Sequence, residues 1–130
     1  MANLASLPRV LIVDDDTNVL ETFARMLKLH GHEVLTAVDA DAGLSEVDNF
    51  HPDAVILDLK MPHVDGITFL RRLRSKSTHG HTPVAIITGN YLFDETVLAT
   101  MRESHTEVYF KPLLVDELIA IAHRLFQRST

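Results

Sequence analysis

The sequence predicts an α/β protein in which one parallel, five-stranded sheet is covered by helices on both faces. Five short apolar runs alternate along the chain with five stretches whose apolar residues recur at helical spacing. The apolar runs are almost uninterrupted, as in strands that are buried on both faces. Such alternation favours parallel strands joined by right-handed helical crossovers, which bring the carboxyl ends of all the strands to one edge.

Length and composition limit the function classes. The 130 residues are enough for one domain, which we place at 8–130 after a flexible tail at 1–7, and 46% hydrophobic with 23% charged residues is typical of globular proteins. A net charge of −6 argues against a nucleic-acid surface. The absence of cysteine excludes disulfides and thiolate metal sites. With no apolar run of membrane-spanning length and no leader-like start, we expect a cytoplasmic protein.

The first strand and helix are predicted from "RVLIVDDDTNVL". Val10 to Val13 form a short apolar run rich in branched side chains, which is typical of a buried strand. Asp16 or Thr17 then caps a helix, because Asp and Thr accept hydrogen bonds from the first free N–H groups of a helix. Gly31 ends this helix, whose apolar face carries Leu20, Phe23 and Leu27.

The middle of the chain continues the alternation. We predict a strand over 32–38, a weaker helix over 39–50, and a strand over 53–59 that runs from apolar residues into Asp58. The turn-type segment "MPHVDG" follows, and Asp65 is expected to cap the next helix. The apolar face of that helix carries Ile67, Leu70 and Leu73.

The last part of the chain supplies two more strand and helix pairs. Strands are predicted over 82–89 and 107–110, and helices over 92–104 and 114–126. The final helix has an apolar stripe wider than one face of a sheet requires. Two interpretations follow: part of the stripe serves a partner or a second copy, or the helix is simply well buried.

Chemically reactive side chains follow the predicted strands. Asp14, Asp15, Asp58, Thr88 and Lys111 all fall at or just after strand ends, so the predicted sheet brings them to one edge. Several carboxylates without His or Cys form a hard oxygen site that suits Mg²⁺. A lysine would repel a metal ion unless an anion lies between them, and a phosphoryl group on a carboxylate fits that position.

Four segments resemble the signature segments of the receiver domain of two-component response regulators. They are "LIVDDDTNVL", "PDAVILDLKMPHVDG", "PVAIITG" and "YFKPL", and the resemblance extends over 8–125. It implies a doubly wound, flavodoxin-like (βα)5 fold, in a chain similar to the stand-alone regulators of chemotaxis. The chain is then either a stand-alone regulator or a receiver cut from a longer protein.

The resemblance also implies roles for individual residues. Asp58 is the phosphoacceptor, and Mg²⁺ is held by Asp14, Asp15 and Asp58 together with the backbone carbonyl of Lys60. Thr88 supplies the switch hydroxyl, Lys111 contacts the phosphoryl oxygens, and the peptide bond before Pro112 is cis.

The same resemblance implies partners rather than a substrate. We expect the domain to take a phosphoryl group from a histidine kinase, a phosphotransfer protein or a small phosphodonor, and to signal by changing its surface. We do not expect an enzyme that turns over an outside substrate. The expected output surface, for a protein partner or a homodimer, is formed by the fourth helix, the fifth strand and the fifth helix, with no direct contact to nucleic acid or membrane.

Two positions depart from the family pattern. Gly89 stands where receivers usually carry Ala or Ser, and Val108 stands where they usually carry an aromatic. Tyr109 cannot replace that aromatic, because neighbouring residues of a strand point to opposite faces of the sheet. We therefore expect activation to move mainly the loop over 89–93.

These residues also allow other interpretations. The histidines His30, His32, His79 and His81 are expected to be ordinary loop residues rather than metal or phosphotransfer sites. A phosphatase of the haloacid dehalogenase type also uses an Asp nucleophile with Mg²⁺, but its pattern requires Thr or Val where this chain has Asn18. A receiver that serves only as a binding scaffold is the third hypothesis, and the intact set of acidic residues, Thr88 and Lys111 argues against it.

Overall fold

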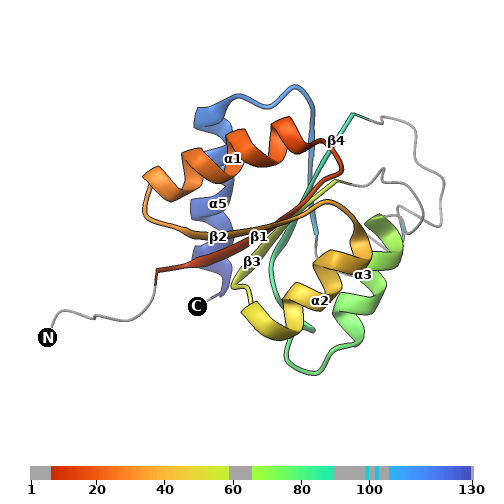
Figure 1. Cartoon of the computed structure of the whole chain (residues 1–130). Helices are drawn as coiled ribbons and strands as arrows, with labels where there is room; N and C mark the ends of the chain where they lie inside the picture. The colour runs from red at the N-terminus through yellow and green to blue at the C-terminus, as the bar shows by residue number, and fades with distance from the viewer. Residues whose placement is uncertain (1–6, 59–65, 90–98, 100–101, 103–105, 130) are drawn as a thin grey trace, which may run out of the picture.

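The computed structural model contains one parallel sheet whose strands lie in the order β2-β1-β3-β4-β5 (Figure 1). The structure describes residues 7–58, 66–89, 99, 102 and 106–129. The strands are β1 Arg9–Val13, β2 Glu33–Ala37, β3 Ala54–Leu57, β4 Val84–Thr88 and β5 Glu107–Phe110. Every neighbouring pair is parallel, which confirms the predicted α/β class with its flavodoxin-like strand order.

Helices cover both faces of this sheet. They are α1 Thr17–Leu29, α2 Ala40–Phe50, α3 Gly66–Ser75 and α5 Val115–Ser129. Figure 1 shows α1 and α5 on one face and α2 and α3 on the other, and each pair is in contact. The helix predicted over 92–104 falls outside the described residues except for Ala99 and Arg102, so the helix labels pass from α3 to α5.

The alternating side chains of the central strands build two separate apolar layers. In β1, Leu11 and Val13 pack in the layer beneath α2 and α3, whereas Val10 and Ile12 pack in the layer beneath α1 and α5. All four side chains are buried. Burial on both faces explains why the strand is apolar without a break.

Local capping fixes where the first helix begins. Asp16 is the N-cap of α1, and its side chain accepts hydrogen bonds from the backbone N–H groups of Asn18 at 3.0 Å and Val19 at 3.3 Å. Gly31 follows the helix with a φ of 89°, a conformation that side chains disfavour. Both ends of the predicted helix are therefore confirmed.

A glycine allows α2 to approach the sheet closely. A Cβ atom at Gly43 would lie 2.9 Å from Cε2 of Phe69, closer than real Cβ contacts, and 3.0 Å from Cγ2 of Val13, tighter than most of them. Gly43 therefore sets the distance between α2, α3 and β1. At its other end α2 is closed by His51, whose φ of 52° is in the left-handed region.

Two histidines of the predicted loops are buried. His32 and His79 lie outside the helices and strands, as expected, but only 8% and 4% of their surface is exposed. The His32 ring stacks on Phe126 of α5 at 5.1 Å between ring centroids, and His79 stacks on His51. Loop residues have no periodicity that reveals burial, so the sequence does not predict these ring contacts. His30 and His81 are exposed, and Asp65 lies outside the described residues.

Among the helices of the described residues, none is both long enough and apolar enough to span a membrane.

Candidate functional site

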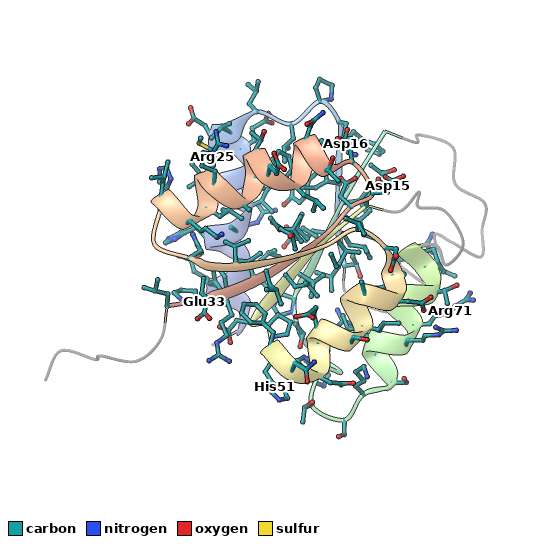
Figure 2. The ribbon with its side chains drawn as sticks, in the orientation of Figure 1. Asp15, Asp16, Arg25, Glu33, His51 and Arg71 are labelled. Carbon is teal, nitrogen blue, oxygen red and sulfur yellow. The ribbon has the colours of Figure 1, made fainter. Side chains whose placement is uncertain are left out.

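The carboxyl ends of β1, β3 and β4 hold the backbone of the candidate site. The Asp14 N–H donates to the carbonyl of Ala37 at 3.1 Å, and the Asp58 N–H donates to the carbonyl of Val13 at 2.9 Å. Both aspartates thus continue the ladder of the sheet by one residue, which leaves little freedom for their Cα atoms. Figure 2 labels Asp15 and Asp16 at this same end of the sheet.

Three carboxylates converge at this edge. Asp14, Asp15 and Asp58 each offer an oxygen, and these oxygens lie within 4.8 Å of one another. Asp14 and Asp58 are buried, with 4% and 6% of their surface exposed, whereas Asp15 is exposed. Carboxylates at such spacing repel one another and suit a hard divalent cation. The donor set fits Mg²⁺, and among the described residues this is the one group of three or more candidate ligands so close together.

Lys111 brings a positive charge to the two buried carboxylates. Its Nζ lies 3.3 Å from Oδ2 of Asp14 and 3.5 Å from Oδ2 of Asp58. Burial lowers the pKa of Lys111, but the negative charges of Asp14 and Asp58 outweigh burial and raise the pKa above its usual value. Lys111 is therefore an ammonium ion with two hydrogen-bonded anionic neighbours.

Backbone pairing positions Lys111 as well. Its N–H donates to the carbonyl of Thr88 at 2.9 Å, so the end of β4 holds the start of the segment that follows β5. The Thr88 side chain is completely buried, and Gly89 is exposed. The Lys111–Pro112 peptide bond is cis, the isomer that the resemblance implies. Lys60, whose carbonyl is the remaining predicted ligand, lies outside the described residues.

The structure tests the argument about Val108 and Tyr109. Val108 packs against the layer beneath α2 and α3, whereas Tyr109 packs against the layer beneath α1 and α5. The Tyr109 hydroxyl donates to Glu107, and the guanidinium of Arg124 donates to the Tyr109 oxygen and lies 5.8 Å from the ring centre. The two residues therefore face opposite sides, as predicted, and Tyr109 does not take the place of the missing aromatic.

One contact of the site was not predicted. The backbone N–H of Asp16 donates to Oδ1 of Asp14 at 3.0 Å, in addition to the role of Asp16 as the cap of α1. The signal was present in the sequence, because Asp often accepts from the backbone two residues later. This bond ties the orientation of the Asp14 carboxylate to the start of α1.

Comparisons with known proteins agree with this geometry. The family model described as "Response regulator receiver domain" matches residues 10–123. The transcriptional regulatory protein PrrA of Mycobacterium tuberculosis is 36% identical over 121 residues, which cover 93% of this chain and 51% of that protein. The regulatory protein AtoC of Escherichia coli is 35% identical over 124 residues, or 95% of this chain and 26% of that protein. The chain thus spans about half, or less, of the length of these relatives.

Solved structures give the same result. A response regulator receiver domain protein from Clostridium thermocellum has a TM-score of 0.83 at 31% identity, covering 94% of this chain and 96% of that one. The chemotaxis protein CheY4 of Vibrio cholerae has a TM-score of 0.83 at 24% identity over 92% of this chain and 99% of that one, which supports the fold alone. From the family match, the relatives, the strand order and the acidic edge, we conclude that the chain belongs to the response regulator receiver domains of two-component systems.

Proposed function

We propose that the chain is a phosphoacceptor switch in which Asp58 takes a phosphoryl group in a Mg²⁺-dependent reaction. The observation that carries this proposal is the position of Lys111, whose Nζ lies within 3.5 Å of both Asp14 and Asp58 beside the third carboxylate, Asp15. An ammonium ion and a cluster of metal-binding carboxylates at one point match the charge pattern of a transferring phosphoryl group.

The proposed step is a phosphoryl transfer from a phosphohistidine. A carboxylate oxygen of Asp58 attacks the phosphorus atom, the P–N bond breaks, and the electron pair leaves with the imidazole nitrogen of the donor. When bound, Mg²⁺ supplies neutralisation of the phosphoryl oxygens, and Asp14, Asp15 and Asp58 would hold it. Lys111 binds a phosphoryl oxygen, and the Thr88 hydroxyl donates a hydrogen bond to another.

The product is a mixed anhydride on Asp58, and attack by water returns the carboxylate and inorganic phosphate. The domain therefore assists its own phosphorylation and dephosphorylation and does not act on an outside ester. Membership of the receiver family also argues against the hypothesis of a haloacid dehalogenase phosphatase.

Mass spectrometry after incubation with acetyl phosphate and Mg²⁺ tests the proposal. We expect one adduct of about 80 Da that is lost in hydroxylamine, in EDTA-treated samples and in Asp58→Asn. Asp16→Asn is the matched control, because Asp16 caps α1 at the same edge without belonging to the carboxylate cluster. An adduct that persists in Asp58→Asn would disprove the assignment.

The proposed partners are a histidine kinase or phosphotransfer protein upstream and a protein partner or a second copy downstream, all in the cytoplasm. Support for an output surface comes from Phe110 of β5 and Leu114 just before α5, which are 42% and 68% exposed although both are apolar. Sedimentation with and without beryllofluoride and Mg²⁺ tests the homodimer. An unchanged monomer would exclude the second copy and direct the search to a different protein.

A further inference from the structure

A second group of ligand-type side chains lies at the edge of the sheet opposite the carboxylates. A cavity of about 490 Å³ opens between the turn that follows α2 and the loop that joins α3 to β4, at the amino ends of β3 and β4. The residues that line it include three histidines, His51, His79 and His81, together with Asp53. Figure 2 labels His51 at this end of the molecule and Asp15 at the other.

His79 has one ring nitrogen held by a hydrogen bond and the other without a hydrogen-bond partner among the described residues. Its Nδ1 lies 2.8 Å from the hydroxyl of Thr82, and its side chain is buried, with 4% of the residue exposed. Its Nε2 is also buried and has no hydrogen-bond partner among the described residues. In the tautomer whose Nδ1–H donates to Thr82, Nε2 carries a free lone pair. A histidine held by an oxygen on one nitrogen and open on the other is the usual arrangement of a metal-binding imidazole.

The surroundings keep His79 neutral and in place. Burial lowers the pKa of His79, and the nearby His51 and Lys76 act in the same direction. A neutral imidazole is the form that binds metal. Arg74 fixes the loop, because its guanidinium donates to the carbonyl of His79 at 3.1 Å and to that of Thr82 at 2.6 Å.

His51 is positioned to complete the site. Its left-handed backbone, with a φ of 52°, places its ring over His79 at 5.9 Å between centroids and 12° between ring planes. Parallel rings do not point their lone pairs at one atom, so binding requires a side-chain rotation. His51 and His81 are both exposed, so their rings can turn without displacing the core, whereas the buried His79 is held by Thr82. Among the described residues, the three imidazoles are not a group whose ligand atoms already lie within 4.8 Å of one another, so the ion itself would have to draw the two exposed rings inward.

We propose that His79, His51 and His81 form a binding site for a first-row divalent transition ion such as Zn²⁺, with His79 as the fixed ligand and the other two closing on the ion. Imidazole nitrogens suit Zn²⁺ and not Mg²⁺, so the ion is of a different class from the one proposed for Asp58. Asp53, which also lines the cavity and accepts a hydrogen bond from the backbone N–H of Arg9 at 2.9 Å, adds one negative charge there. The bound ion would join the turn after α2 to the loop after α3.

Titration of the full chain with ZnCl₂ tests this site, with Mg²⁺ in excess to occupy the carboxylates. Calorimetry is expected to show one ion per chain, and ¹⁵N spectra of the imidazoles are expected to shift at His79 and His51. His79→Gln and His51→Asn are each expected to weaken binding at least about tenfold. Asn suits the left-handed backbone at position 51, so this second variant keeps the fold even if the buried substitution does not.

Two controls make the result decisive. His123→Gln removes an exposed imidazole on α5, and Asp15→Asn removes one carboxylate from the opposite edge, so neither is expected to change the affinity. The proposal is overturned if Zn²⁺ does not bind at micromolar concentrations, or if affinity is unchanged in His51→Asn. It is overturned equally if Asp15→Asn abolishes the binding, because the ion would then sit among the carboxylates.

Discussion

Substitution of Asp58 by Asn is expected to stabilise the fold when Mg²⁺ is absent. The Asp58 carboxylate is attracted to Lys111 at 3.5 Å, worth about 5 kcal/mol at an effective dielectric constant of about 20. Its repulsion from the buried Asp14, with oxygens within 4.8 Å, costs at least about 3.5 kcal/mol on the same basis. Repulsion from the exposed Asp15 adds about 1 kcal/mol, because water screens that charge.

These Coulomb terms nearly cancel, so the cost of burying the charge decides the sign. Asp58 is 6% exposed, and removing a carboxylate from water costs several kcal/mol that its neighbours return only in part. The neutral amide of Asn avoids most of that cost. We therefore expect Asp58→Asn to raise the free energy of unfolding in EDTA by about 1–2 kcal/mol, or a few degrees in Tm.

Urea unfolding followed by circular dichroism measures this difference, in EDTA and again with Mg²⁺. Mg²⁺ at about 100 times its Kd is expected to stabilise the unmodified chain by about 2.7 kcal/mol and the variant by much less. Asp41→Asn is the matched control, because Asp41 is exposed and pairs with Arg72 at the surface, where the loss is within about 0.5 kcal/mol. If Asp58→Asn is less stable than the unmodified chain in EDTA, the attraction to Lys111 dominates and the reasoning is wrong.

The remaining predictions concern other parts of the molecule. Gly43→Ala is expected to cost about 1–3 kcal/mol in urea unfolding, because the new methyl group would lie 2.9 Å from the Phe69 ring, and an unchanged midpoint would show that the helices separate freely. The pKa of His79 is lowered in the folded chain, so on acidification the unfolded chain binds the proton first, and the free energy of unfolding is expected to fall as the pH drops below about 6.5. In His79→Gln this free energy should fall less with pH, and an equal dependence on pH in both proteins would contradict the prediction. Thermal unfolding of Asp15→Ala is expected to respond less to Mg²⁺ than that of the unmodified chain, and equal shifts would argue against a carboxylate-bound ion. When beryllofluoride and Mg²⁺ are added, changes in amide chemical shift are expected to be small at Val108 and large in the loop over 89–93, of which residues 90–93 lie outside the described residues. Large changes at Val108 would refute the idea that activation moves mainly this loop.

The sequence was most informative where local rules and the fold agree. Strand β5 begins and ends at the predicted residues, and Asp16 caps α1, because alternation and capping are properties of a few neighbouring positions. The meeting of Lys111 with Asp14, 97 residues earlier in the chain, was predicted from a different rule, the convergence of parallel strand ends.

The sequence was least informative where tertiary contacts decide. His79 is buried because Arg74 draws the carbonyls of its loop together and because His51 lies over its ring, and neither contact has a signature in the sequence. The third strand was predicted over 53–59, but β3 is Ala54–Leu57, since periodicity does not mark the residue at which a ladder ends. The short distance between α2 and α3 depends on Gly43, whose absent side chain has meaning only beside Phe69.

The place of β3 in the sheet separates the proposed phosphoacceptor, Asp58, from the proposed output surface at β5. β3 is hydrogen-bonded on both sides, to β1 and β4, and all four of its side chains are buried, whereas β5 has one neighbour and is partly exposed along its length. Substitutions near Asp58 therefore disturb three strands at once, β3 and its two neighbours, while substitutions along β5 disturb only β5 and β4. Among related domains, we therefore expect the sequence around Asp58 to diverge slowly and the sequence of the edge strand β5 to diverge quickly. Duplicated copies of such a domain would then acquire different partners while sharing the same reaction.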